Sequence, residues 1–111
     1  MDWKAYMDNI GDITAEMEAA APEVVAAYRR LSATAKRQGA LELETRELIA
    51  LSIAVAIRCE PCIGFHARAL GALGAERDRV AEALGMAVSM QGGPGYMYMA
   101  KALEAFDQLK P

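Results

Sequence analysis

Aromatic residues are scarce in this chain of 111 residues, at 6% of the total, although 54% of the residues are hydrophobic. The apolar content comes mainly from alanine, leucine and methionine, which are better suited to helices than to sheets. One β-branched run, from Leu48 to Ile57, has the composition of a buried strand, but the chain offers no second strand to pair with it. The composition therefore predicts an all-α protein, and the length predicts a single domain over residues 1–111.

The chain also lacks a strong excess of positive or negative charge, and it lacks a long apolar run. The net charge is −3, whereas binding to nucleic-acid phosphates needs a basic patch, so no nucleic-acid partner is expected. The longest strongly apolar run covers about ten residues, short of the roughly 20 that a membrane-spanning helix needs. No basic stretch followed by an apolar one precedes residue 30, which argues against a secretory signal. We expect a cytoplasmic protein without a membrane partner.

Apolar spacing, proline and glycine together predict about five to six helices in a compact bundle. The expected main helices cover about 22–38, 41–57, 60–74, 76–90 and 95–109, with a glycine-rich connector at 91–95. Before them, a short helix is expected within 1–11 and a separate helix start within 12–20, so the first twenty residues contribute one or two short pieces. The segment from Leu41 is apolar nearly all round, so other helices should surround it. A chain of this size gains from burying more surface between copies, which favours a homo-oligomer.

Residues capable of covalent chemistry are few and lie together. Both cysteines of the chain, Cys59 and Cys62, and its one histidine, His66, fall within eight consecutive positions. Pro61 suits the first turn of a helix, so a break near 58–60 should precede a new helix that carries the cysteines at its start. In that helix the three side chains share one face, and two residues three apart have Cβ atoms about 5–6 Å apart. A slight tightening would let the sulfur atoms bond reversibly.

A thiolate, rather than a thiol, is the nucleophile, and an unperturbed cysteine with a pKa of about 8.5 is mostly protonated at neutral pH. The unpaired N–H groups at a helix start favour the anion. Arg58 and Arg68 add positive charge nearby, whereas Glu60 opposes it. His66 follows Cys62 by four residues, the spacing at which a helical neighbour can accept a thiol proton. In the cytoplasm, such a cysteine pair is more often catalytic or metal-binding than a permanent crosslink.

Glu47 begins the apolar run that leads to the cysteines. A carboxylate at the edge of a buried helix can serve as a general base, and it can equally be an ordinary exposed glutamate in a first helical turn. In a strictly antiparallel hairpin folded at Cys59, Glu47 would lie roughly 7 Å along the axis from His66. The two helices must therefore cross at a steep angle, or a water molecule must join the two side chains.

Glu47, Cys59, Cys62 and His66, at these spacings, resemble the active-site signature of the AhpD-like alkylhydroperoxidases, the thiol branch of the carboxymuconolactone decarboxylase superfamily. The similarity covers about residues 41–90. It implies a small helical protein that assembles into trimers or hexamers and reduces hydroperoxides through its cysteine pair. It also implies that Glu47 and His66 relay protons to the thiols. Pro61 stands where the best studied members have a second histidine, and the decarboxylase branch lacks the cysteine pair.

The resemblance implies an oxidoreductase with four catalytic residues, Cys59, Cys62, His66 and Glu47, and with no cofactor and no metal. Its partners would be a hydroperoxide substrate and a dithiol electron donor, either a small dithiol or a thioredoxin-like or lipoyl-bearing protein. The spacing to His66 favours Cys62 as the attacking sulfur, with Cys59 as the resolving one.

Three other interpretations remain open at this point. The protein could act as a disulfide reductase or adaptor that recycles a peroxiredoxin. The same four side chains are zinc-ligand types, although two cysteines three apart within a helix are an unusual arrangement for zinc. Alternatively the cysteines are simply buried in a non-catalytic helical oligomer. Methionines such as Met86 and Met90 could line a pocket for an alkyl peroxide, but a place in the core or in a subunit contact is the more common role.

Overall fold

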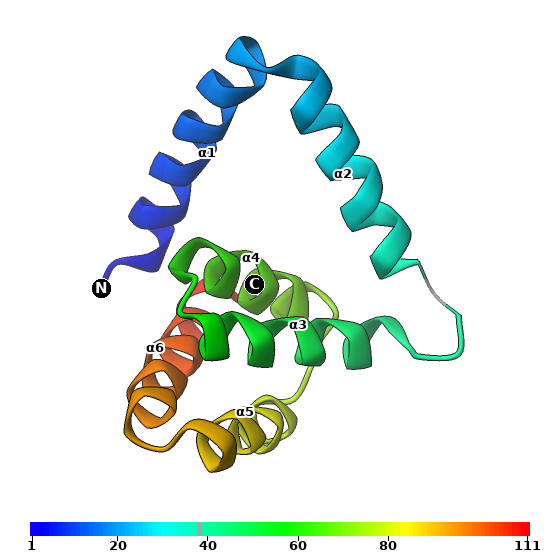
Figure 1. Cartoon of the computed structure of the whole chain (residues 1–111). Helices are drawn as coiled ribbons and strands as arrows, with labels where there is room; N and C mark the ends of the chain where they lie inside the picture. Colours follow the sequence, from blue (N-terminus) through cyan, green and yellow to red (C-terminus); the bar gives the residue numbers. More distant parts are fainter. Residues whose placement is uncertain (38) are drawn as a thin grey trace.

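The computed structural model describes residues 1–37 and 39–111, and all regular secondary structure in these residues is helical (Figure 1). The helices are α1 (Trp3–Ala20), α2 (Pro22–Lys36), α3 (Leu43–Ile57), α4 (Glu60–Ala72), α5 (Arg77–Gln91) and α6 (Gly93–Leu109). The all-α fold class is confirmed. Among the described residues, no helix is both long enough and apolar enough to cross a membrane.

Helices α3 to α6 pack around a shared core and form the body of the molecule. Leu51 and Val55 of α3 have no exposed surface, and they meet buried side chains from each of the other three helices. The larger of these partners are Ile63 and Leu70 of α4, Val80 and Leu84 of α5, and Phe106 of α6. As the apolar composition of α3 predicts, this helix is surrounded by its neighbours.

Helices α1 and α2 form a hairpin, residues 3–36, that extends away from the body and is called the arm below (Figure 1). Its buried side chains are Trp3, Met7 and Val25. The prediction of two separate helices before residue 20 was wrong, because α1 runs through Gly11 without a break. A glycine inside a helix costs only about 1 kcal/mol, which the rest of an 18-residue helix can offset. The predicted connector at 91–95 is also shorter than expected, since only Gly92 separates α5 from α6.

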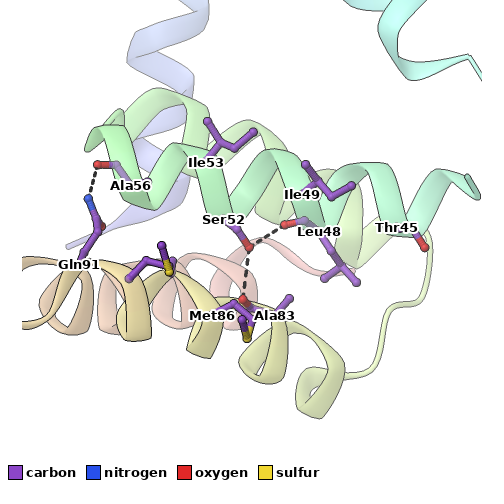
Figure 2. A pocket seen from close by; sticks show the side chains of 11 residues that line it. Thr45, Leu48, Ile49, Ser52, Ile53, Ala56, Ala83, Met86 and Gln91 are labelled. Carbon is purple, nitrogen blue, oxygen red and sulfur yellow. Dashed lines mark hydrogen bonds between the residues drawn. The ribbon is translucent and has the colours of Figure 1, made fainter.

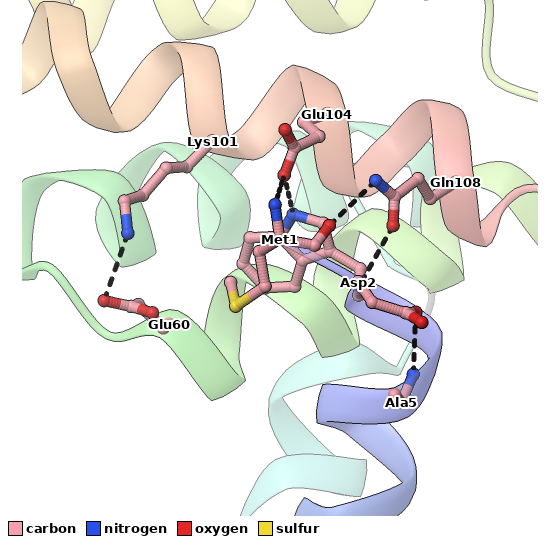
Figure 3. Close-up of polar contacts among 8 residues, drawn as sticks. Met1, Asp2, Ala5, Glu60, Lys101, Glu104 and Gln108 are labelled. Atoms are coloured by element: carbon pink, nitrogen blue, oxygen red, sulfur yellow. Dashed lines mark hydrogen bonds and ion pairs between the residues drawn. The ribbon is translucent and has the colours of Figure 1, made fainter.

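The start of the arm is fastened to α6 (Figure 3). The indole Nε1 of Trp3 and the amino group of Met1 both donate to Oε1 of Glu104, at 2.9 Å and 3.1 Å. The backbone N–H of Trp3 donates to the side chain of Gln108 at 2.8 Å. The hydrogen bonds from Met1 and Trp3 lower the pKa of the Glu104 carboxyl group. These contacts fix where α1 leaves the body.

An ion pair joins the start of α5 to the end of α6, and it yields a prediction about stability. The Arg77 guanidinium donates two hydrogen bonds to Asp107, at 2.9 Å and 3.0 Å, and lowers the pKa of that carboxyl group. A lowered pKa in the folded state stabilises the protein above the unfolded-state pKa of about 3.9, and this stabilisation is lost as the pH falls through the folded value. Because the pair is exposed, Asp107→Asn should lower the free energy of unfolding by about 0.2–1 kcal/mol at pH 7.

Urea unfolding of wild type and Asp107→Asn at pH 7 and at pH 3 measures this contribution. The difference between the two proteins should shrink at pH 3, because the Asp107 carboxyl group is then mostly protonated in the unfolded state. Asp12→Asn, on the exposed face of the arm, is the control and should show no such difference. An equal loss for Asp107→Asn at both pH values would contradict an electrostatic origin.

Candidate functional site

The turn between α3 and α4 places the two cysteines. Helix α3 ends at Ile57, and Arg58 adopts a left-handed conformation with φ 59° and ψ 44°, which reverses the chain. The backbone N–H of Cys59 then donates to the carbonyl of Ala54 at 3.0 Å, which closes the end of α3. Cys59 is the N-cap of α4, and Pro61 lies in its first turn. The predicted break and the predicted place of the cysteines at a helix start are confirmed.

Cys59 and Cys62 are joined by a disulfide, with their Cα atoms 5.2 Å apart. Both residues are partly exposed, so neither is sealed inside the core. The backbone N–H of Cys62 points at Sγ of Cys59, with a donor–acceptor distance of 3.3 Å. An N–H directed at this sulfur, at the positive end of a helix, would favour a Cys59 thiolate once the disulfide is reduced.

Glu47 of α3 and His66 of α4 contact each other directly. Nδ1 of His66 lies 2.6 Å from Oε2 of Glu47, and the two side chains are 20% and 9% exposed. This short distance excludes the water-bridged alternative and requires α3 and α4 to cross rather than run strictly antiparallel. An ionised carboxylate only accepts hydrogen bonds, so with Glu47 ionised the proton of this contact lies on Nδ1, which donates to Glu47. The Nε2 of a neutral His66 is then free to accept a proton.

A third charged group reaches this pair from the arm. Nζ of Lys36, in the last turn of α2, lies 3.5 Å from Oε1 of Glu47. Sequence reasoning missed it, because a lysine in the last turn of a helix is explained by the helix dipole alone. The sequence holds one signal for this contact. Lys36 precedes Glu47 by only eleven residues, and Gly39 between them marks the end of the helix that carries Lys36. Each oxygen of the buried carboxylate therefore faces a different nitrogen, one on Lys36 and one on His66.

Removing the Lys36 charge tests whether the arm contributes to the behaviour of this site. Because the amine is 45% exposed, its interaction with Glu47 is screened by water, and Lys36→Met should slow a reaction of the thiols that uses the Glu47–His66 pair by no more than about tenfold. The loss of rate should be smaller in Lys36→Arg, which retains the charge. KM should stay the same in both variants. Steady-state rates for the two variants at low and high salt measure this. Equal losses in both variants would show that the shape of the side chain matters rather than its charge.

The other charged residues near the cysteines differ in their surroundings. Arg58 and Arg68 are both exposed. Glu60, whose charge was expected to oppose a thiolate, is paired with Lys101 of α6 at 3.4 Å (Figure 3). That lysine partly offsets the negative charge beside Cys59. Within residues 1–37 and 39–111, no three side chains of the metal-binding types converge on one point.

Fold and site together define a class of protein: an all-helical chain with a Cys-x-x-Cys disulfide at the start of α4 and, one turn later on that helix, a histidine paired with a glutamate of α3. The model of the carboxymuconolactone decarboxylase family matches residues 22–105. The chain belongs to this family, as the resemblance implied.

This chain is also similar to relatives of nearly the same length. An uncharacterised protein of Haemophilus influenzae is 38% identical over 109 residues, which cover 98% of this chain and 96% of that protein. One from Cupriavidus necator is 34% identical over 108 residues, covering 97% and 96%. Neither has a described activity that could be transferred to this chain.

Two crystal structures have a similar fold. The apo form of a carboxymuconolactone decarboxylase family protein from Legionella pneumophila has a TM-score of 0.94 at 41% identity, and the match covers 98% of this chain and 97% of that one. A family protein from Thermotoga maritima, for which a role in an antioxidative response has been suggested, has a TM-score of 0.78 at 22% identity, covering 91% and 89%. At that identity the second likeness supports the fold alone.

Proposed function

We propose that this protein is a thiol-dependent peroxidase that reduces organic hydroperoxides or hydrogen peroxide through Cys59 and Cys62. The observation that carries the proposal is the redox pair at the start of α4, one turn before a histidine whose Nδ1 is held by Glu47. A dithiol that closes into a disulfide stores two electrons, which is the number that reduction of a peroxide requires. The suggested antioxidative role of the Thermotoga protein agrees with this chemistry.

The first half-reaction begins with the reduced protein. Nε2 of His66 accepts the proton of the Cys62 thiol, and the resulting thiolate attacks one oxygen of the peroxide. The O–O bond breaks, Cys62 becomes a sulfenic acid, and His66 returns the proton to the departing alkoxide, which leaves as an alcohol. Glu47 holds the imidazole in the required tautomer and compensates its charge while it is protonated.

The second half-reaction restores the disulfide and then the dithiol. The Cys59 thiolate, favoured by the N–H of Cys62, attacks the sulfenic sulfur, and one water molecule leaves. An external dithiol then reduces the disulfide by two thiol–disulfide exchanges. The sum is one hydroperoxide and one dithiol converted to one alcohol, one water and one disulfide.

Partners and assembly belong to the same proposal. The reductant is a small dithiol or a thioredoxin-like or lipoyl-bearing protein, and the peroxidase acts as a homo-oligomer in the cytoplasm. A peroxiredoxin is the partner in the competing scheme, in which this protein is an adaptor that passes electrons to another protein's disulfide. An adaptor would act far faster on an oxidised peroxiredoxin than on free peroxide.

One experiment separates these schemes. The fully reduced protein receives one equivalent of cumene hydroperoxide, and its mass and free thiols are then measured. A peroxidase loses both thiols and two hydrogen atoms in mass, and one equivalent of cumyl alcohol forms. Retention of both thiols after this treatment, with rapid thiol loss to an oxidised peroxiredoxin, would reject the peroxidase in favour of the adaptor.

A further inference from the structure

We propose that the ion pair between Glu60 and Lys101 sets how readily the Cys59–Cys62 disulfide is reduced, because it limits the negative charge that acts on the sulfur of Cys59. The inference rests on the redox cycling of the cysteine pair, which is part of the proposed function, but it does not require that the substrate is a peroxide. The step concerned is the last one of the cycle. Two electrons from an external dithiol break the S–S bond, that dithiol becomes a disulfide, and the protein gains two thiols, or one thiol, one thiolate and a released proton.

Two negative charges compete for the start of α4 in the reduced protein. The backbone N–H of Cys62 points at Sγ of Cys59 at 3.3 Å, so a Cys59 thiolate would gain from the positive end of the helix. Glu60 is the next residue, in the first turn of the same helix, and the same helix end stabilises its carboxylate. A like charge so near disfavours the thiolate and therefore the reduced protein. The oxidised protein has no thiolate and escapes this repulsion.

Lys101 of α6 brings a positive charge to this helix start (Figure 3). Its Nζ lies 3.4 Å from Oε1 of Glu60 and 5.3 Å from the centre of the Tyr98 ring, which precedes it by one turn of α6. The attraction between the ammonium and the ring adds to the ion pair and holds the charge in place. The two paired side chains are 41% and 31% exposed, so water weakens the pair without removing it. Lys101 therefore offsets part of the Glu60 charge that acts on Cys59.

Other groups beside the cysteines add little net charge. Tyr6 of α1 lies close enough to Glu60 and Lys101 for both charges to act on its phenol. Burial, together with the negative charge of Glu60, raises the pKa of Tyr6, so the phenol is neutral at pH 7. Arg58 and Arg68 are both exposed, and water and salt screen their charges.

The α3 side supplies charges that cancel. The negative charge of Glu47 is offset by Lys36, 3.5 Å away. The opposite face of α3 lines the groove between α3 and α5, and Met86 and Met90 of α5 lie in this groove, 65% and 82% exposed (Figure 2). None of the described residues that line the groove is charged. The balance of charge at the Cys59 sulfur therefore depends mainly on the pair between α4 and α6.

The test removes each charge of the pair separately, in Lys101→Met and in Glu60→Gln. In a Cys62→Ser background only the Cys59 thiol titrates, and the ultraviolet absorbance of the thiolate at a series of pH values gives its pKa. Lys101→Met should raise that pKa, because the Glu60 charge is then uncompensated, and Glu60→Gln should lower it. Since both side chains are partly exposed, each shift should be roughly threefold in the acid dissociation constant. Far-ultraviolet circular dichroism checks that each variant is folded.

Lys110→Met is the matched control. Lys110 also pairs with an acidic side chain, Asp107, and its Nζ also lies over an aromatic ring, 5.6 Å from the centre of Phe106. It packs against Gly71 at the far end of α4, about 18 Å along the helix from Cys59. That separation exceeds the Debye length of about 10 Å at 0.1 M salt, so this variant should leave the pKa of Cys59 unchanged.

Equilibration with mixtures of reduced and oxidised dithiothreitol measures reduction itself, in variants that keep both cysteines. At pH 8.5, Lys101→Met should favour the disulfide and Glu60→Gln the dithiol, each by roughly threefold, which corresponds to about 15 mV. The shifts should shrink at lower pH, where the thiol is protonated in every variant. Unchanged equilibria, or shifts of the same sign in both variants, would overturn the role of the ion pair alone. A wild-type disulfide that dithiothreitol cannot open and close reversibly would overturn the redox cycle as well.

Discussion

Replacing Cys62 with serine is expected to abolish dithiol-dependent peroxide consumption, and so is replacing Cys59. Each substitution leaves one sulfur atom, and one sulfur atom cannot close the disulfide that an external dithiol reduces. Serine is the appropriate replacement for Cys59, because a hydroxyl can cap α4 as the sulfur does in the native chain. Loss of activity in Cys59→Ser would then reflect chemistry rather than a frayed helix.

The two variants should differ in a single turnover. If Cys62 attacks the peroxide, Cys59→Ser should form one sulfenic acid per chain and stop, and a dimedone adduct on Cys62 would reveal it by mass spectrometry. Cys62→Ser should take up no dimedone. The reverse pattern would make Cys59 the attacking sulfur and leave the dithiol scheme intact. Sustained wild-type turnover in either variant would reject that scheme.

The fold was largely predictable because helix signals in this chain are local. Pro22, Pro61 and Gly92 mark helix boundaries through their own backbone preferences, whatever surrounds them. Gly11 misled the prediction because one glycine lowers helix stability by only about 1 kcal/mol, which its neighbours can offset. That α2 would extend away from the body was not predictable, for another reason. An apolar row on α2 indicates that the helix packs against something, and it does not indicate whether that partner belongs to the same chain.

The arrangement of the candidate site was predictable only in part. Cys59, Cys62 and His66 share one helix, so their spacing alone places them on one face. Glu47 lies on another helix, and its contact with His66 depends on the angle at which α3 and α4 cross. That angle follows from the left-handed turn at Arg58 and from core packing, neither of which the spacing reveals. Lys36 depends on one further turn, between α2 and α3, and was missed altogether.

Replacing His66 with glutamine should slow peroxide reduction by roughly 10²–10⁴, and Glu47→Gln should act in the same direction. Without the imidazole, nothing adjacent to Cys62 in the proposed scheme removes its proton or returns it to the alkoxide. Glu47→Gln preserves size and can still accept a hydrogen bond from Nδ1, but it removes the negative charge that stabilises the imidazolium. A change of this size corresponds to about 3–5 kcal/mol of transition-state stabilisation.

A pH profile separates acid–base catalysis from structural damage. In His66→Gln, the rate should rise with pH up to the pKa of the unassisted thiol, about 8.5 for an unperturbed cysteine, because hydroxide then supplies the thiolate. A distorted site would show the same loss at every pH. Glu44→Gln is the matched control, since it lies three residues earlier on α3 and pairs with Arg79 away from the thiols. Its rate should equal that of wild type, whereas near-wild-type rates in both His66→Gln and Glu47→Gln would show that this buried pair serves the fold rather than the chemistry.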